Sequence, residues 1–347
     1  MPDIFDAKIT AKNFKTIWER NQEDRPPFVG EMFFTPVSQT GLDINLVKGK
    51  NGVPVALVAA NWDTDVLYRD RIGFEALQAE MPFFKEAYKT SEKLRQQIIT
   101  VQEQYRQPLF NEIFNDVEDL LLGADVTAER LRMQLIGTGT ISIQENGVDK
   151  QYNYGVDSST QMNTESTLWS ATSAKPLKTF IDRIKAYEDL TDEKAKYAVM
   201  GKAVLNKLIH DSTVDTYFQN LSTPDLYPTD EARQAYVEQK TGVKIILAKQ
   251  KYVKARDKNK TKVSYYPEDR YTLLSTLDLG ETIYGTTPEE IDLLGGLSKA
   301  ATVEVVGNGV AITTWKETDP VCNIVKVSEV VLPSCPNIDQ VYIVKVL

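Results

Sequence analysis

One segment between residues 279 and 292, LGETIYGTTPEEID, has the residue types of a phosphate-binding loop. Two glycines and a run of threonines precede a helix start, as they do in loops that hold nucleotide phosphates. Such a loop needs a lysine after its last glycine to neutralise the phosphate, and here a threonine follows instead. We therefore interpret the segment as a helix cap. Thr287 is the N-cap, Pro288 takes the first helical position, and Glu290 completes a capping box.

The single histidine, His210, is followed directly by Asp211 and Ser212. A catalytic relay needs a nucleophile, a base and an orienting acid brought together from separate segments, so three adjacent residues do not form one. We interpret His210 as a helix-end residue that interacts with free carbonyl groups. Cys322 and Cys335 form no CxxC pair and have no histidine nearby, so we expect packed thiols. No catalytic residue, metal ligand or cofactor site is predicted.

A basic run from Lys249 to Lys262, KQKYVKARDKNKTK, carries seven lysines or arginines and one aspartate. With Tyr252 it could contact nucleic-acid backbone and stack on a base. Its central Asp-Lys-Asn-Lys is typical of a turn, which favours a solvated hairpin tip or a charged contact with an acidic neighbour. The whole chain has a net charge of -9, which argues against a dedicated sequence-reading nucleic-acid-binding protein.

The elements around these segments can be predicted from turns and periodicity. The chain has 347 residues, enough for two domains or one elaborate domain. Asn-Gly pairs accept the positive backbone angles of tight turns. They predict three β-hairpins, at Asn51-Gly52, Asn146-Gly147 and Asn308-Gly309.

A long helix is predicted between the first two hairpins. Apolar residues recur every three or four positions from Leu94 to Leu120, which is the pattern of one helix face. Pro108 predicts a kink or a break in this helix. Gly123 is expected to end it, and a shorter helix to follow through Ile136.

The middle of the chain has a mixed pattern. Amphipathic helices are predicted at residues 175–190, 195–212 and 231–241, and strands at residues 243–253 and 262–276. After residue 295 the pattern is strand alone, so an α/β domain is predicted to be inserted into the first domain. The sequence shows no signal peptide and no run of apolar residues long enough for a membrane span.

Four segments, in a shared order, resemble phage major capsid proteins of the lambda-like E family. The C-terminal segment has a strand with Trp315, an Asp-Pro turn, a strand closing on Leu332-Pro333, and a last strand after Pro336-Asn337. The segment at residues 265–290 resembles the family's stretch in which a proline turn and a strand lead to Leu-Gly, a short strand and a Tyr-Gly-x-Thr-Pro-Glu helix start. Two further matches lie at residues 67–88 and 132–157, so the resemblance covers most of residues 60–347.

The resemblance implies the α+β Hong Kong 97-like capsid fold, with an N-terminal arm, an extension-loop hairpin, a peripheral domain with a spine helix, and an inserted axial α/β domain. The expected limits are 1–35 for the arm, 36–68 for the extension loop, 69–168 and 296–347 for the peripheral domain, and 169–295 for the axial domain. Residues 143–154 and 302–315 are expected in the peripheral sheet.

The function implied by the resemblance is assembly of an icosahedral phage head rather than catalysis. The extension-loop tip, with Lys48, Lys50, Asn51 and Gly52, is expected to lie over an adjacent subunit. One branch of the fold joins a loop lysine to a neighbour's asparagine by an isopeptide bond, and no pattern here supports that bond.

An arm helix is also expected to make contacts. Phe14, Ile17 and Trp18 share one face of it and could grip a neighbour or a scaffolding protein. The expected partners are the chain itself, as pentamers and hexamers, a separate scaffolding protein because the chain starts near the arm, a portal, optionally a decoration protein, and packaged DNA by non-specific proximity only. The expected location is the virion, after assembly in the bacterial cytoplasm.

Three other classes of protein stay open at this point. A cellular nanocompartment shell would have the same fold and enclose enzymes instead of DNA. A cytoplasmic hydrolase with a cap domain would be a small oligomer in solution. A nucleic-acid-binding protein that uses residues 249–262 would bind DNA with a steep dependence on salt.

Overall fold

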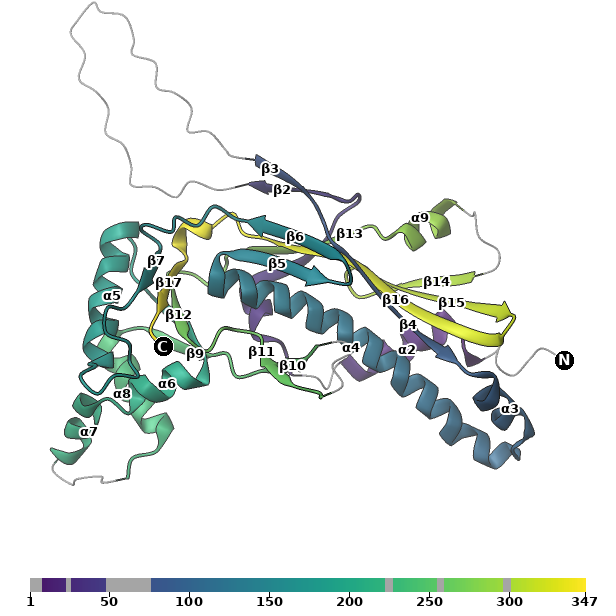
Figure 1. The fold of residues 1–347 in the computed structure, drawn as a ribbon, viewed down its shortest axis with the longest axis horizontal. Helices are drawn as coiled ribbons and strands as arrows, with labels where there is room; N and C mark the ends of the chain where they lie inside the picture. Colours follow the sequence, from purple (N-terminus) through teal and green to yellow (C-terminus); the bar gives the residue numbers. More distant parts are fainter. Residues whose placement is uncertain (1–7, 23–25, 48–75, 222–226, 255–258, 296–300) are drawn as a thin grey trace, which may run out of the picture. The chain divides into compact units, whose positions relative to one another are not determined.

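The computed structural model describes residues 8–22, 26–47, 76–221, 227–254, 259–295 and 301–347 (Figure 1). The chain divides into two compact units. Unit 1 contains residues 1–45, 78–132 and 281–334, and unit 2 contains residues 46–77, 133–280 and 335–347. Unit 1 is therefore discontinuous in sequence, because the chain leaves it twice and returns.

A six-stranded sheet forms the framework of unit 1. Its longest strand, β16, runs antiparallel to β15, β4 and β13. Val330 of β16 pairs with both Phe83 and Gly285, so β4 and β13 lie on opposite sides of β16. The strands are β1 (Phe34–Ser38), β4 (Phe83–Thr90), β13 (Gly280–Gly285), β14 (Ala301–Val306), β15 (Val310–Thr318) and β16 (Val321–Ser334).

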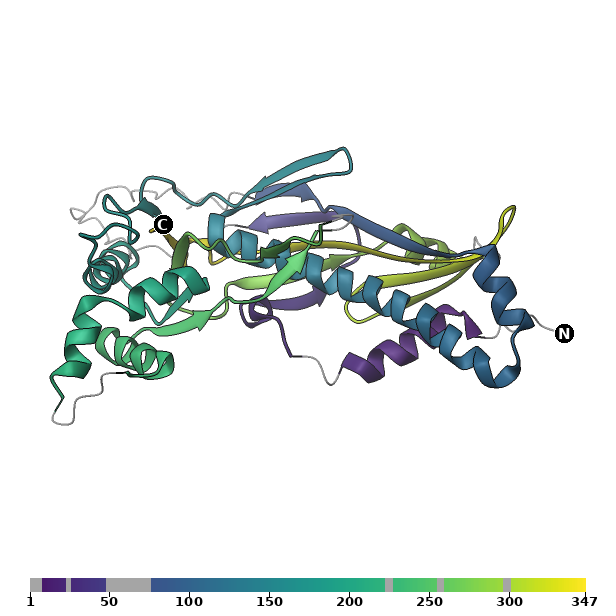
Figure 2. The same cartoon turned by 60° about the horizontal axis from the view of Figure 1, so that its bottom comes forward.

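Helices bury their apolar faces on this sheet. Helix α2 (Ala11–Gln22) lies beside the first half of α4 (Arg106–Thr138), as Figure 2 shows, and the Phe14 and Phe114 rings are 5.3 Å apart. Both helices share one apolar core with β14, β15 and β16. Helix α9 (Pro288–Gly295) packs near β14 and β15. The face of unit 1 covered by α2 and α4 is therefore its hydrophobic core.

The long helix predicted from residue 94 is two helices. Helix α3 (Glu92–Thr100) ends where Val101 and Gln102 take extended backbone angles, before η2 (Glu103–Tyr105) and α4. Pro108 does not break the helix, because it lies in the first turn of α4, where a missing N–H costs no hydrogen bond. The prediction that Gly123 ends the helix is also wrong. Packing of the neighbouring α4 side chains on the sheet outweighs the roughly 1 kcal/mol that a glycine costs inside a helix.

A mixed five-stranded sheet forms the framework of unit 2, in the order β7-β17-β12-β8-β9 (Figure 1). Strand β17 pairs antiparallel with β12 and parallel with β7. The strands are β7 (Met162–Thr164), β8 (Tyr197–Met200), β9 (Lys244–Leu247), β12 (Arg270–Leu274) and β17 (Tyr342–Lys345). The helices are α5 (Pro176–Thr191), α6 (Lys202–Ile209), α7 (Ser212–Gln219) and α8 (Asp230–Thr241).

The single helix predicted at residues 195–212 was wrong in its first part. Residues 197–200 form strand β8, and Gly201 separates it from α6. The side chains of Ala198, Val199 and Met200 are all fully buried. A strand buried on both faces is a continuous apolar run, and periodicity alone does not separate such a run from a helix.

Two of the three predicted hairpins are confirmed. Asn146 and Gly147, with φ of 50° and 80°, connect β5 (Thr140–Glu145) to β6 (Val148–Asn153), as a type I′ turn requires. A three-residue turn with Asn308-Gly309 joins β14 to β15. The Asn51-Gly52 turn lies outside the described residues, beyond the strand pair β2 (Asp43–Val47) and β3 (Ala76–Glu80).

The limits of the two units differ from the domain limits expected from the sequence. Residues 281–285 pair with β16 in unit 1, although they were expected in the inserted domain. Residues 342–345 pair with β12 in unit 2, although they were expected in the peripheral domain. The β5–β6 hairpin belongs to unit 2 and forms a two-stranded sheet of its own, whereas residues 302–315 lie in the six-stranded sheet of unit 1.

The predicted capping box at α9 is confirmed. The Thr287 backbone N–H donates to the Glu290 carboxylate at 2.6 Å, and the Glu290 backbone N–H donates to Thr287 Oγ1 at 3.4 Å. These bonds satisfy amide groups that have no partner within the helix. The segment that resembles a phosphate-binding loop thus ends strand β13 and begins α9.

Replacement of Thr287 by alanine is expected to destabilise the start of α9 by about 0.5–2 kcal/mol, because the cap loses its acceptor oxygen. Hydrogen exchange of the Glu290 and Ile291 amides measures this loss, and both amides should exchange faster. Thr287→Ser keeps the hydroxyl and is the control. Equal protection in the alanine and serine variants would show that the cap contributes nothing.

Candidate functional site

The residues predicted to make assembly contacts fall into two groups. Lys48, Lys50, Asn51 and Gly52 lie outside the described residues. The arm residues lie on α2, which confirms the predicted helix. Of these, the side chains of Phe14 and Trp18 are buried in the core of unit 1, and Ile17 is half-buried. In this structure the aromatic face therefore packs within its own subunit, and a contact with a neighbour stays a prediction.

The residues weighed for catalysis have identifiable structural partners. His210 follows α6, its backbone N–H donates to the Asn206 carbonyl, and its Nε2 lies 3.4 Å from an Asp230 oxygen. Asp211 caps α7 by accepting the Thr213 amide at 2.7 Å. Cys322 and Cys335 are free and buried, as predicted. Burial raises the pKa of the Cys335 thiol, which makes it a weak nucleophile near neutral pH.

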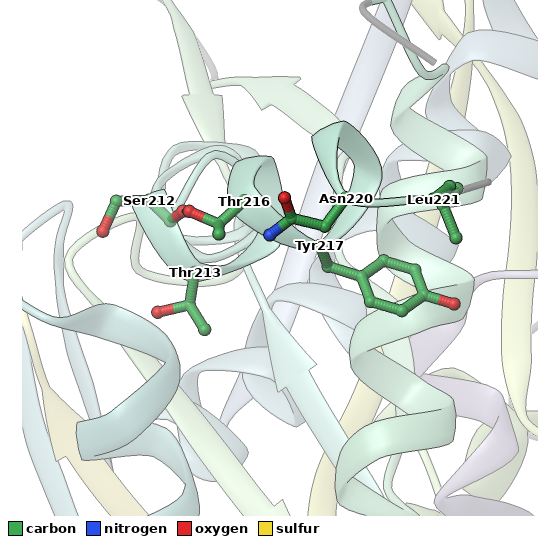
Figure 3. Close-up of a pocket in the computed structure, with 6 residues that line it drawn as sticks. All are labelled: Ser212, Thr213, Thr216, Tyr217, Asn220 and Leu221. Carbon is green, nitrogen blue, oxygen red and sulfur yellow. The ribbon is translucent and has the colours of Figure 1, made fainter. Parts of the chain in front are cut away.

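A hollow of about 440 Å³ lies beside α7 in unit 2 (Figure 3). Its lining side chains project from α7 and the residues after it: Ser212, Thr213, Thr216, Tyr217, Asn220 and Leu221. These side chains offer hydroxyl, phenol and amide groups. Because this lining has no carboxylate, imidazole, amine or thiol, it supplies no general base near neutral pH.

Sequence reasoning missed a buried ionic cluster in unit 1. Glu129 and Arg132 lie one turn apart on α4, and their side chains are only 1% and 2% exposed. Glu129 accepts the Gly30 backbone N–H at 2.8 Å. Arg132 Nε donates to Thr282 Oγ1 of β13 at 2.7 Å, and its Nη1 lies 3.6 Å from a Glu31 oxygen. The cluster fastens the segment η1 (Val29–Met32) to both α4 and β13.

Only glycine fits at residue 30. A Cβ added there would lie 2.4 Å from Glu129 Oε2 and 2.9 Å from Arg132 Cβ. The backbone therefore approaches α4 closely enough for its N–H to reach the buried carboxylate. The sequence does contain one sign of this cluster. Glu129 and Arg132 are charged residues three positions apart within the stretch AERLRMQLI, whose other face is apolar.

A second buried acid, Glu329, lies on β16 opposite Val310 and Phe84. It is 2% exposed, and neither carboxylate oxygen has a hydrogen-bond partner among the described residues. Burial raises the pKa of Glu329 well above its ordinary value, and the charge of Asp125 raises it further. The charges of Arg132 and Arg130 lower this pKa, but by less than burial and Asp125 raise it. Burial without a hydrogen-bond partner thus favours the neutral, protonated form of the Glu329 carboxyl, since an unpaired charge there would be very costly.

Burial also raises the pKa of Glu129, from 4.5 to about 7. The Gly30 N–H and the Arg132 guanidinium oppose this rise, but Arg132 is 3.5 Å from Glu129 and shared with Thr282 and Glu31. Because the folded pKa exceeds the unfolded one, the stability that Glu129 contributes is complete below pH 4.5. It is lost as pH rises to about 7, by on the order of 3 kcal/mol.

The Glu129→Gln variant should therefore lose less stability than wild type between pH 4.5 and pH 7.5. Urea unfolding at the two pH values measures this difference. Glu329 is present in both proteins, so its own pH dependence cancels in the comparison. Parallel stability curves for the two proteins would contradict a raised pKa at Glu129.

Two further classes of site were searched across the described part of the chain. No group of three or more histidine, cysteine, aspartate or glutamate residues there could hold a metal ion. None of the described helices combines the length and the apolar character that a membrane crossing requires.

Comparison with protein families decides between the remaining classes. The sequence model of the family described as phage major capsid protein E matches residues 18–346. The chain belongs to this family. The resemblance noted in the sequence is thus confirmed, and the protein is a structural shell subunit of a phage head, located in the virion capsid. Family membership does not favour the nanocompartment reading.

Solved structures confirm the fold of the phage major capsid protein E family. A chain assigned as the capsid protein of a prophage in E. coli CFT073 is 14% identical, with a TM-score of 0.60 over 97% of this chain and 99% of that one. A phage-related protein from Bordetella bronchiseptica RB50 is 11% identical, with a TM-score of 0.55 over 95% and 96%. The capsid of cyanophage A-1(L) is 9% identical, with a TM-score of 0.50 over 93% and 94%.

These likenesses confirm the Hong Kong 97-like fold predicted from the sequence. No curated protein sequence matches this chain.

Proposed function

We propose that this subunit assembles as pentamers and hexamers into the icosahedral shell of a tailed-phage head, which encloses packaged double-stranded DNA without catalysing a reaction. The observation that carries the proposal is the match to the phage major capsid protein E family over residues 18–346. The geometry supports it, since the residues weighed for chemistry cap helices or pack in cores.

The proposed partners follow from the family. Copies of the chain bind one another, and a separate scaffolding protein, a portal and optionally a decoration protein join them. The extension loop, with Lys48, Lys50, Asn51 and Gly52, lies over an adjacent subunit in this proposal. Packaged DNA is a neighbour by proximity only, because a chain with a net charge of -9 repels phosphate over most of its surface.

Electron microscopy of the protein, expressed alone and together with the proposed scaffolding protein, tests the proposal. Uniform icosahedral particles, tubes, or rings of five and six subunits are the expected result. Only small compact oligomers in both preparations would overturn it and favour the hydrolase reading. Particles that enclose enzymes instead of DNA would favour a nanocompartment.

A further inference from the structure

Two surfaces of opposite charge have few or no ion-pair partners among the described residues of this chain. The first is the hairpin of β10 (Lys251–Val253) and β11 (Lys262–Ser264) in unit 2. Five of its lysines are exposed: Lys249, Lys251, Lys254, Lys260 and Lys262. Among the described residues, Glu268 is the one carboxylate within ion-pair distance of any of them, 3.0 Å from Lys251. Most of this positive charge is unbalanced.

The register of the hairpin places part of this charge on one face. Val253 pairs with Lys262 across the two strands, and Lys251 lies two residues before Val253. Paired residues and residues two apart share one face of a hairpin, so these three side chains lie on the same face. Val253 is 41% exposed, which places an apolar side chain between two lysines. The Tyr252 and Tyr265 rings, 4.9 Å apart, support the hairpin.

The second surface lies on α4 and β4 in unit 1. Glu112, Asp116 and Asp119 occupy positions i, i+4 and i+7 of α4, which form one face and a row roughly 10 Å long. Glu112 and Asp119 are exposed, and Asp116 is half-buried. In the described residues, no lysine, arginine or histidine lies within ion-pair distance of these three. This row is a strip of unbalanced negative charge.

The carboxylates of this strip lie close enough to act electrostatically on one another and on Tyr88 of β4. Burial raises the pKa of Asp116, and the charges of Glu112 and Asp119 raise it further. The phenol of Tyr88 on β4 has its pKa raised by burial first and then by Asp116 and Asp119. Tyr88 is 43% exposed. An exposed aromatic side chain therefore lies within the acidic strip, as Val253 lies among the lysines.

We propose that the lysine face of the β10–β11 hairpin binds the acidic strip of α4 and β4 on a second copy of this chain. The contact places Lys251 and Lys262 against the row Glu112–Asp119, with Val253 against Tyr88. Each surface combines an exposed apolar or aromatic side chain with nearby charges, a combination common in protein interfaces. The inference rests on the proposed self-assembly, and it names which surfaces meet.

Charge complementarity favours a second copy as the occupant. Two subunits with a net charge of -9 repel each other on average, so association needs a local patch that reverses the sign. The hairpin is such a positive patch. The strip on α4 carries the opposite charge over a similarly short length of chain. Complementary charges of this kind fix orientation and accelerate association more than they add affinity.

Charge reversal on each surface tests the proposal. The hairpin variant is Lys251→Glu with Lys262→Glu, and the helix variant is Glu112→Lys with Asp119→Lys. Each variant alone should assemble at least about tenfold more slowly than wild type in light scattering at low salt. The two variants mixed should recover most of that loss, because each reversed hairpin then meets a reversed helix on the other chain.

The matched control is Lys185→Glu with Lys194→Glu, two exposed lysines of unit 2 outside the hairpin. It changes the net charge as the hairpin variant does and should assemble like wild type. Recovery in a chain that carries all four substitutions, without recovery in the mixture, would overturn the proposal because the contact would lie within one chain. Normal assembly of the hairpin variant with lost DNA binding would overturn it in favour of nucleic acid.

A second measurement separates this contact from assembly as a whole. Isotopically light and heavy wild-type subunits are mixed and treated with a carbodiimide, which joins a lysine directly to a carboxylate. Mixed-isotope cross-links between hairpin lysines and Glu112, Asp116 or Asp119 are expected. Shells without such cross-links would overturn the contact and leave the proposed function standing. The absence of both particles and cross-links would overturn both.

Discussion

Replacement of Arg132 by methionine is expected to destabilise unit 1 by about 3–5 kcal/mol at pH 8, which is the usual cost of removing one partner from a buried ion pair. The methionine has similar volume, so the loss comes from charge and hydrogen bonds. Glu129 would lose the guanidinium that lowers its pKa, so at pH 8 it must either stay charged without a partner or bind a proton, and Thr282 would lose the donor at 2.7 Å. Urea unfolding of purified subunits measures the change.

The pH dependence of this variant distinguishes charge from packing. Near pH 5, Glu129 is protonated because its pKa is about 7, so the loss of Arg132 should cost clearly less than at pH 8. The double variant Glu129→Gln with Arg132→Met should be more stable at pH 8 than Arg132→Met alone. An equal loss at both pH values would show that Arg132 acts by packing rather than by neutralising Glu129.

Replacement of Phe180 by alanine is expected to destabilise unit 2 by about 3–5 kcal/mol, the typical cost of removing a buried phenylalanine ring. Phe180 on α5 is fully buried, and its ring is 5.2 Å from the Tyr271 ring in an edge-to-face arrangement. The Trp169 ring also stacks on the Tyr271 ring, with the two ring centroids 5.6 Å apart. The cavity would therefore open at the centre of the core that joins α5 to the sheet.

Hydrogen exchange resolved by peptide tests this prediction. Peptides from α5 and β12 should lose protection in Phe180→Ala, while β15 and β16 of unit 1 should keep theirs. Phe180→Leu fills part of the space and should lose less than half as much stability. Uniform loss of protection across both units would show that they unfold as one cooperative body.

The elements that sequence predicted correctly are those specified by neighbouring residues. The capping box at Thr287 involves a partner three residues away, and the Asn146-Gly147 turn involves two adjacent residues. Helix α8 ends at Gly242, which has φ of 72°, as its position after the last periodic residue predicted. In each case the energetic reason lies within a few residues and can be recognised without the fold.

The features that sequence missed depend on distant partners. Glu129 meets Gly30 across 99 residues, and Arg132 meets Thr282 across 150. The residues next to Glu329 in the sequence do not indicate that it lies on a strand flanked by β15 and β4, where its carboxyl is buried. Strand β8 was mistaken for helix because an apolar run of four residues fits either structure until the sheet around it is known. The family resemblance supplied the fold but not these contacts.

The position of β17 between β7 and β12 has a consequence for synthesis on the ribosome. Strand β12 and strand β7 are made long before residues 342–345, yet both pair with them. Until those residues leave the exit tunnel, β7 has no partner in the sheet of unit 2, and β12 is paired on one side only, with β8. A nascent chain interrupted before residue 342 therefore cannot complete the sheet of unit 2, so the last residues made decide whether this unit can close.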